Sequence, residues 1–294
     1  MIVTVDPDAG FCYGVERTIE IAEQELAKDG TLFCLGQIVH NEEEEQRLKN
    51  LGLVVIDHEQ FKKLQHSKVL IRAHGEPPET YKIAAANNIQ LVDASCPIVL
   101  AIQKKIRRTS EKTSEKNGQI VIYGRKNHPE VIGLAGQAGN HAIVVEDEND
   151  LGKIDFTKPV NLFAQTTKSP ESYQKLIAKI STRLDENQMH TKPLFVPENT
   201  ICRHVSGRDK NLKKFAAAND IVIFVGGLNS SNGKFLSGVC REVNHKTRYI
   251  QSADMLQPGW FLGAETAGVT GATSTPRWLL EDVAGRIKQI TLQS

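Results

Sequence analysis

Three of the five cysteines occur at matching points along the 294-residue chain: Cys12, Cys96 and Cys202. Each follows a short apolar segment, at residues 2–5, 89–92 and 194–196 respectively. Thiolates ligate iron–sulfur clusters and zinc, so three cysteines brought to one place would suit a metal centre. No C-x-x-C pair is present, so spacing alone carries no metal signature. The remaining two cysteines, Cys34 and Cys240, are interpreted as buried structural residues, which is the common role of a lone cysteine.

Polar loops recur at similar distances behind these cysteines. A helix, a strand and a glycine-containing loop follow each cysteine, and a second strand and loop come later. The separation from cysteine to first loop is 28, 32 and 28 residues, and the separation between the two loops is 34, 38 and 44 residues. The first loops contain His40, His128 and Ser230, and the second loops contain His74, Thr166 and Ser274.

The loop residues suit an anionic ligand and proton transfer. Ser230, Ser231 and Asn232 open a helix, where hydroxyls and backbone amides favour an anion. The three loop histidines would contact a diphosphate as cations or hydrogen-bond donors. Glu130 lies two residues after His128 at a helix start and is the best carboxylate candidate for a proton donor. Neither a G-x-G-x-x-G motif nor a Walker P-loop occurs, so a nucleotide motif is absent.

The elements that must position these residues alternate between strands and helices. This alternation predicts an α/β fold with parallel sheets and helical crossovers, in which loops at the carboxyl ends of strands line the ligand crevice. We expect three pseudo-repeated α/β units, at residues 7–95, 96–198 and 199–294. The strand before Cys96 comes at the end of the first unit, and the strand before Cys202 comes at the end of the second. By the same rule, the strand within residues 1–6, which precedes Cys12, should join the sheet of the third unit.

Composition narrows the functional classes. With 36 basic and 35 acidic residues the formal net charge is +1, which gives no indication of nucleic-acid or membrane binding. No signal peptide or membrane-spanning run is evident, so a cytoplasmic location is expected. The basic stretch at residues 104–108 is typical of a solvated helix face, with docking of an acidic electron carrier as the alternative.

Taken together, the motifs resemble the family of 4-hydroxy-3-methylbut-2-enyl diphosphate reductases, the last enzymes of the non-mevalonate isoprenoid pathway. The resemblance spans nearly the whole chain in the family's order. It rests on these stretches: Gly10-Phe-Cys-Tyr-Gly14, Val39-His-Asn41, Ala73-His-Gly75, Ser95-Cys-Pro97, Asn127-His-Pro-Glu-Val131, Gln165-Thr-Thr167, Ile201-Cys202, Asn229-Ser-Ser-Asn232 and the Ser274 loop.

The resemblance implies a three-domain trefoil around one [4Fe–4S] cluster that has three cysteine ligands and one open iron. Cys12, Cys96 and Cys202 would be the ligands, Thr166 would orient the substrate hydroxyl and Glu130 would relay protons. Reductive dehydroxylation would give isopentenyl or dimethylallyl diphosphate, with electrons from a ferredoxin- or flavodoxin-type donor. The diphosphate would be held by His40, His74, Ser230, Ser231, Asn232 and Ser274, with His128 nearby.

Two other classes of function use the same residues. A zinc-dependent hydrolase would draw its ligands from the same cysteines and histidines, and metal analysis would separate it from an iron–sulfur enzyme. A non-enzymatic phosphometabolite-binding module would keep the cysteines as core residues, so Cys96→Ser would leave its ligand binding intact.

Overall fold

The computed structural model describes residues 1–39, 41–114, 117–139, 141–186, 194–203, 207–228 and 230–292, without the side chains of residues 114 and 231. The chain forms two compact units. One contains residues 1–55 and 207–294, and the other contains residues 56–206. The predicted boundaries of the three domains stay a prediction.

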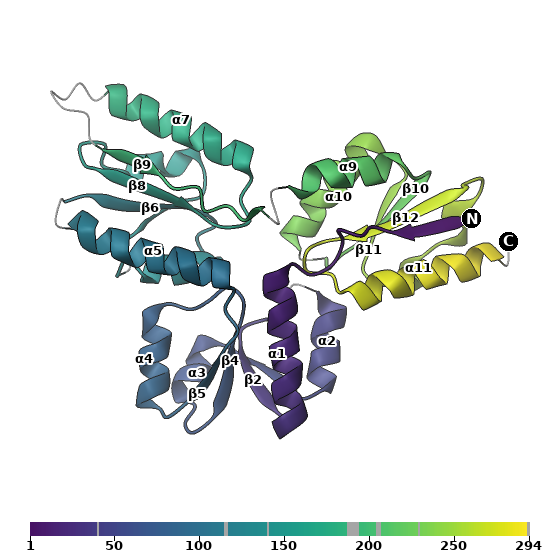
Figure 1. Ribbon diagram of the computed structural model, residues 1–294, viewed down its shortest axis with the longest axis horizontal. Helices are drawn as coiled ribbons and strands as arrows, with labels where there is room; N and C mark the ends of the chain where they lie inside the picture. Colours follow the sequence, from purple (N-terminus) through teal and green to yellow (C-terminus); the bar gives the residue numbers. More distant parts are fainter. Residues whose placement is uncertain are drawn as a thin grey trace. The chain divides into compact units, whose positions relative to one another are not determined.

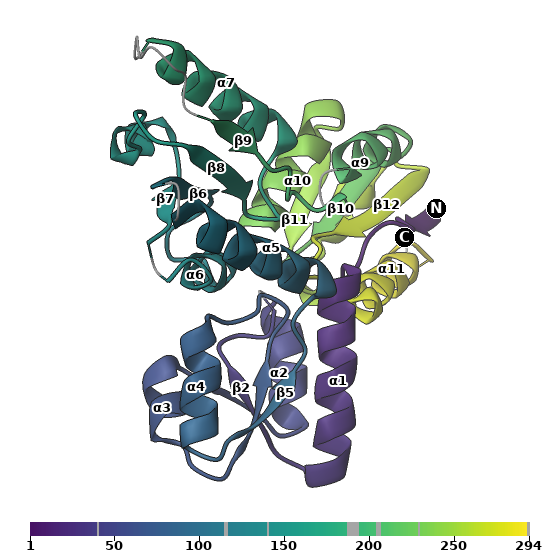
Figure 2. The same ribbon diagram turned by 60° about the vertical axis from the view of Figure 1, so that its left-hand side comes forward.

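Three four-stranded sheets carry the fold (Figures 1 and 2). Sheet A has the order β1-β12-β10-β11, sheet B the order β3-β2-β4-β5 and sheet C the order β7-β6-β8-β9. All recorded pairings are parallel. The strands of sheet A are β1 (Ile2–Val5), β10 (Ile221–Val225), β11 (Thr247–Ile250) and β12 (Thr266–Gly271). Those of sheet B are β2 (Leu32–Leu35), β3 (Leu53–Ile56), β4 (Lys68–Ile71) and β5 (Gln90–Asp93). Those of sheet C are β6 (Gln119–Tyr123), β7 (Ile143–Val145), β8 (Val160–Ala164) and β9 (Phe195–Pro197).

Helices connect the strands, as parallel pairing requires. The helices of the sheet B segment are α1 (Tyr13–Asp29), which precedes β2, and α2 (Glu42–Asn50), α3 (His58–Lys63) and α4 (Pro78–Ala86), which connect its strands. Those of the sheet C segment are α5 (Pro97–Ser114), α6 (Pro129–Gly136), η1 (Glu148–Lys153) and α7 (Pro170–Glu186). Those of the sheet A segment are α9 (Arg208–Ala217), α10 (Ser231–Val243), η2 (Ala253–Met255), η3 (Pro258–Phe261) and α11 (Arg277–Leu292).

The three sheets share one strand order, which is the structural form of the sequence repeat. In each, the first strand after the cysteine lies between the second and the third, and the strand that precedes the next cysteine flanks the third. By this order β1 occupies the fourth place in sheet A, where Ile2 pairs with Thr266 and Val5 with Val269. The predicted α/β fold with three parallel sheets is confirmed.

Sheets C and A are covered by helices on both faces, as expected of parallel sheets. In β6, Ile120 and Ile122 pack into a cluster with α5 and α6, whereas Val121 and Tyr123 face a cluster that includes α7. Figures 1 and 2 show α5 and α7 on opposite sides of sheet C. Sheet A is covered in the same way, by α11 on one face and by α9 and α10 on the other. Within the described residues, no helix combines the length and apolar character that a bilayer crossing needs.

Candidate active site

The shared strand order places the polar loops where ligands bind in such sheets. After the first strand the chain continues to the second strand on one side of it, and then crosses to the third strand on its other side. The carboxyl ends of the first and third strands therefore flank a crevice. In sheet C those strands are β6 and β8, followed by the loops at 124–128 and 165–169. The loops are joined directly, because the amide of Arg125 donates to Gln165 Oε1 at 3.1 Å.

Glu130 is the central titratable group of this crevice. It lies in the first turn of α6 and is 2% exposed. Both carboxylate oxygens accept hydrogen bonds from Thr166: its amide donates to Oε1 at 2.7 Å and its hydroxyl donates to Oε2 at 2.8 Å. Burial raises the pKa of Glu130 to about 7, although the two bonds from Thr166 lower it. A carboxyl group with this pKa is suited to give and take protons at neutral pH.

His128 caps the helix that carries Glu130. Its Nδ1 accepts a hydrogen bond from the Glu130 amide at 3.2 Å, so the neutral ring carries its proton on Nε2. Pro129 occupies the first turn, where its missing N–H costs nothing. The ring of His74 meets that of His128 edge-on, with centroids 5.2 Å apart and an interplanar angle of 80°. The two predicted histidines of this unit therefore lie together.

A left-handed turn supports the His74 loop. Gly75 has a φ of +68°, and a Cβ there would approach Gln103 Nε2 to 2.7 Å. The same amide nitrogen lies close to the position that a Cβ on Gly133 of α6 would occupy. Gln103, a buried residue of α5, thus fills the space between the His74 loop and α6, and only glycine fits at residue 75.

Cys96 and Cys202 are each tied to a polar loop by their own backbone. The amide of Cys96 donates to the carbonyl of Ala73 at 3.0 Å, and the amide of Cys202 donates to the carbonyl of Thr166 at 2.9 Å. Both bonds continue the pairing of the fourth strand along the third. Cys96 therefore lies beside the loop that carries His74, and Cys202 lies beside Thr166; both His74 and Thr166 are predicted substrate-binding residues.

Exposure separates the cysteines into the two groups that the sequence predicts. None of the five forms a disulfide; Cys12, Cys96 and Cys202 are partly exposed, whereas Cys34 and Cys240 are buried. Burial raises the pKa of Cys240 to about 12, which keeps this thiol protonated and unsuited to metal binding. Cys12 caps the N-terminus of α1, and the carbonyl of Cys96 accepts the first bond of α5, from Leu100. A partly exposed thiol at a helix N-terminus is well placed to hold a negatively charged centre.

The loops of sheet A carry neutral polar groups. Ser230 caps α10, its Oγ accepting from the amide of Gly233 at 3.0 Å. Asn232 reaches the next loop, where its Nδ2 donates to Thr273 Oγ1 at 2.7 Å. The neighbouring Ser274 Oγ is buried and has no hydrogen-bond partner among the described residues. An orphaned hydroxyl beside a helix N-terminus is the donor set expected of an anion site.

The predicted site residues are thus described in two sets. The unit of residues 56–206 holds His74, Cys96, His128, Glu130, Thr166 and Cys202, and the other unit holds Cys12, Ser230, Asn232 and Ser274. His40 and the side chain of Ser231 lie outside the described residues. Within the part of the chain that is described, no three His, Cys, Asp or Glu side chains are grouped closely enough to hold a metal ion. The joining of these sets into one site is a prediction.

The sequence reasoning overlooked a buried arginine beside Cys12. Arg208 is 6% exposed, and its Nη2 donates to the carbonyl of Gly271 at 2.6 Å. Burial lowers its pKa, and the nearby carboxylates of Asp6 and Asp8 oppose that shift. A signal was available, because Arg208 lies on the apolar face of α9 together with Leu212 and Ala216.

Comparison with known proteins gives matches over nearly the whole chain. Residues 3–288 match the family described as LytB protein. A 4-hydroxy-3-methylbut-2-enyl diphosphate reductase of Parabacteroides distasonis is 48% identical over 288 residues, covering 98% of each chain. The enzyme of that name from Bacteroides fragilis is 46% identical over 286 residues, covering 97% of each chain.

Solved structures agree with these relatives. One, described as (E)-4-hydroxy-3-methyl-but-2-enyl diphosphate reductase, the terminal enzyme of the non-mevalonate pathway, has a TM-score of 0.76 at 34% identity. The match covers 98% of this chain and 100% of that one. The reductase of Plasmodium falciparum has a TM-score of 0.80 at 25% identity, covering 99% of this chain and 87% of that one. The polar loops, the three partly exposed cysteines and these full-length matches together show that the chain belongs to the LytB protein family.

Proposed function

We propose that this chain is a 4-hydroxy-3-methylbut-2-enyl diphosphate reductase that forms isopentenyl and dimethylallyl diphosphate. The reaction breaks one C–O bond and consumes two electrons and two protons, one proton leaving in water and one forming a C–H bond. The single observation that carries the proposal is the buried pair of Glu130 and Thr166, whose carboxyl group has a pKa of about 7. Full-length relatives with this name support it.

The metal centre that we propose is one [4Fe–4S] cluster held by Cys12, Cys96 and Cys202. Three partly exposed cysteines that form no disulfide, each behind a strand that flanks its sheet's third strand, are a donor set that fits such a cluster. When bound with one iron open, the cluster would supply electrons and a Lewis-acid site for the substrate's hydroxyl group. The buried thiols of Cys34 and Cys240 take no part.

The proton path that we propose runs through Thr166. Its hydroxyl donates its proton to Glu130 Oε2, which leaves the lone pairs of Thr166 Oγ1 available to orient the substrate's hydroxyl group. Glu130 is protonated in a substantial fraction of molecules at neutral pH because its pKa is about 7. In that state the carboxyl O–H would donate to Thr166 Oγ1, and the Thr166 hydroxyl would turn to donate to the substrate's oxygen. Thr166 would then give its proton to the departing oxygen, which leaves as water, and take the proton of Glu130 in its place.

The diphosphate would be held by neutral donors together with imidazoles. The amide end of α10 and the hydroxyls of Ser230, Ser231 and Ser274 would donate to its oxygens, with Asn232 beside them. His40, His74 and His128 would add imidazole N–H donors, for which the fixed tautomer of His128 is suited. Binding the unreactive diphosphate would supply the energy that positions the C–O bond.

The electron donor that we propose is of ferredoxin or flavodoxin type, and the location is the cytoplasm. None of the five cysteines forms a disulfide, which is usual for a reducing compartment. The chain has no G-x-G-x-x-G motif that would indicate a nicotinamide or flavin site of its own. Electrons would therefore have to arrive from a separate molecule.

Iron analysis of cysteine variants tests the metal centre. After anaerobic reconstitution, Cys202→Ser should lose iron and sulfide relative to the unaltered protein, because a ligand is gone. Cys34→Ser and Cys240→Ser are matched controls that should retain both. Full iron retention in Cys202→Ser would remove this residue from the ligand set, and protein that takes up zinc but no iron would favour a hydrolase.

A further inference from the structure

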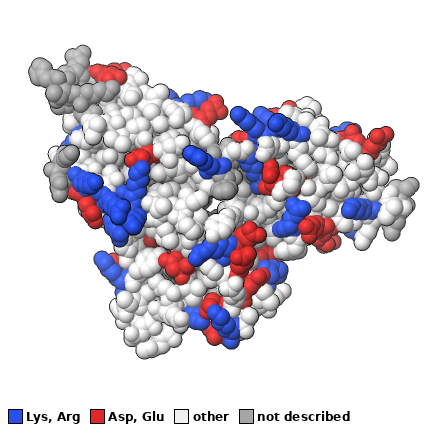
Figure 3. All heavy atoms as spheres, viewed as in Figure 1, with Lys and Arg blue, Asp and Glu red and all other residues white. Residues whose placement is uncertain are grey.

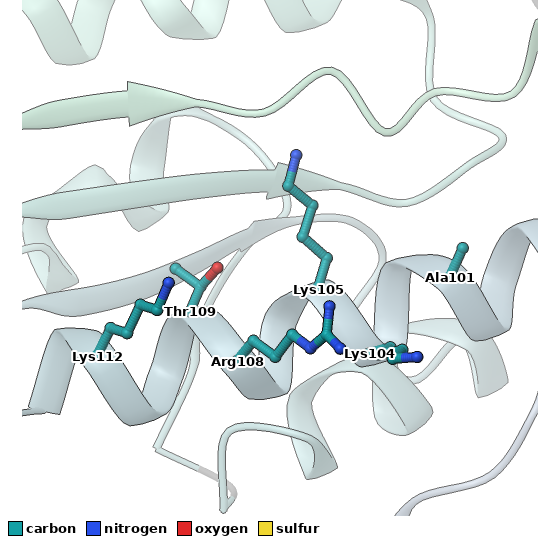
Figure 4. Close-up of a pocket in the computed structure, with 6 residues that line it drawn as sticks. All are labelled: Ala101, Lys104, Lys105, Arg108, Thr109 and Lys112. Atoms are coloured by element: carbon teal, nitrogen blue, oxygen red, sulfur yellow. The ribbon is translucent and has the colours of Figure 1, made fainter.

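Helix α5 carries an exposed stripe of positive charge. Lys104, Lys105, Arg108 and Lys112, with Ala101 and Thr109 between them, line a shallow open groove of about 490 Å³ (Figure 4). We call these six residues the basic face. They recur at intervals of three and four, so they share one side of the helix. Figure 3 shows Lys and Arg side chains gathered over this helix.

Most of this charge is not neutralised locally. Lys105 pairs with Glu198 at 2.6 Å. Within the described part of the chain, Lys104, Arg108 and Lys112 form no ion pair. Many other surface lysines do, including Lys62 with Glu59 and Lys82 with Glu79. The chain as a whole has a net charge of only +1, so the basic face is a local excess. Such an excess attracts an acidic surface.

The basic face adjoins the two segments that carry Cys96 and Cys202. Its helix begins directly after Cys96, and Lys104 is roughly 12 Å along the helix axis from that cysteine. The ion pair of Lys105 holds Glu198, which lies four residues before Cys202. Toward Cys96 the same helix exposes Ile98 (37%) and Leu100 (39%). Apolar side chains bordered by charges are the usual make-up of a protein-binding patch.

We propose that the basic face of α5 is the docking surface for an acidic one-electron-carrier protein. The inference rests on the proposed function, which requires electrons from another molecule. Carrier complexes of this kind use small interfaces steered by charge, and the basic face has the sign and position for one. Nucleic acid fits the same sign less well, because α5 has no aromatic side chain on which a base would stack.

Charge reversal on the basic face tests the proposal. Lys104→Glu/Arg108→Glu changes two exposed residues that form no recorded ion pair, and Lys62→Glu/Lys82→Glu is a control with the same change in net charge on α3 and α4. The probes are an acidic [2Fe–2S] ferredoxin and reduced methyl viologen. The α5 variant should bind the oxidised ferredoxin at least about tenfold more weakly at low ionic strength, with a flatter salt dependence. The control should bind as the unaltered protein does.

Turnover separates docking from chemistry. With reduced ferredoxin the α5 variant should lose rate in proportion to binding, whereas with methyl viologen it should keep the unaltered rate. Equal loss with both reductants, unchanged ferredoxin binding, or equal loss in the control would overturn the proposed surface. Selective loss of oligonucleotide binding with unchanged ferredoxin kinetics would also overturn it, in favour of nucleic acid. If viologen drives no turnover in the unaltered holoprotein, the proposed function fails, whereas the ferredoxin titration still decides the docking surface.

Discussion

The loops of sheet C and those of sheet A occupy the same place in the same strand order but have different chemistry. Behind β6 and β8 lie a buried carboxyl group, whose pKa is shifted to about 7, and the imidazole of His128, which the ring of His74 from the loop after β4 contacts edge-on. Behind β10 and β12, the corresponding positions carry hydroxyls and an amide, joined by the bond from Asn232 to Thr273. One architecture thus provides titratable groups in one sheet and neutral donors in another. Proton transfer is expected of the first pair of loops and anion binding of the second.

The largest effect should come from removing the titratable group of sheet C. Glu130→Gln keeps the shape of the side chain and an oxygen that can accept from Thr166, so fold, iron content and diphosphate binding should persist. Turnover should fall by about a hundredfold or more, because a general acid is lost. Steady-state rates under excess reductant measure this. Asp150→Asn is the matched control. Asp150 is also buried and lies in the unit of residues 56–206, but the pKa of its carboxyl group is lowered, chiefly by the hydrogen bond from Lys153. Unaltered turnover in Glu130→Gln would show that the loops of sheet C do not supply the proton-transfer group that distinguishes them from the loops of sheet A.

A smaller effect should follow from removing a neutral donor of sheet A. The Ser274 hydroxyl has no partner among the described residues, so Ser274→Ala should leave the protein as stable or more stable. Its affinity for inorganic diphosphate should fall by about tenfold, the worth of one hydrogen bond to a charged group. Calorimetric titration and thermal unfolding measure the two quantities.

The next residue provides a control of opposite behaviour. The hydroxyl of Thr275 donates to the carbonyl of Val225 at 2.9 Å inside the core. Thr275→Val should therefore lose stability, because the buried carbonyl loses one of its two donors and keeps only the amide of Ala272 at 3.1 Å, and it should keep its affinity for diphosphate. The same pattern in both variants would show that neither hydroxyl is reserved for an anion.

The smallest effect concerns stability and pH. The folded state raises the pKa of Glu130 from 4.5 to about 7, so it favours the protonated carboxyl group. This stabilisation is fully present below about pH 4.5 and is lost as the pH rises through about 7. Across that window the unaltered protein should lose up to about 1.4 kcal/mol per pH unit relative to Glu130→Gln.

Unfolding free energies of both proteins from pH 5 to pH 8 check this expectation. Glu76 raises the pKa of His58, so this histidine can also titrate in the window, but it is common to both proteins and cancels in the difference. Asp150 titrates below the window and does not interfere. Parallel curves for the two proteins would mean that Glu130 is ionised throughout.

Much of the fold was predictable because its signals are local. The apolar segments before the three cysteines, at residues 2–5, 89–92 and 194–196, match β1, β5 and β9 to within one residue at each end. Helix α3 was missed because only Phe61 of its six residues is buried, so no apolar period exists. Its one signal was the capping box of Asp57 and Gln60. Helix α6 begins at Pro129, directly after its cap His128, so Glu130 lies in the first turn.

The site was predictable in its residues but not in its contacts. The sequence indicated Glu130 and Thr166 separately, and spacing carries no information on which oxygen a hydroxyl bonds. Their pairing follows from the adjacency of β6 and β8, which depends on strand order. Arg208 was not predicted because the groups that stabilise its buried charge, Asp6 and the carbonyl of Gly271, both lie far from it in the sequence.

The placement of β1 in sheet A has a consequence for how the protein is made. Asp6, just after β1, accepts a hydrogen bond from Thr270, 264 residues further along the chain. At ~5–20 residues per second a ribosome needs roughly 15–50 seconds to synthesise that stretch. During this time β1 has no partner strand. Cys12, which follows β1, reaches its final surroundings only after β12 has been made, so assembly of the proposed cluster is expected to follow translation.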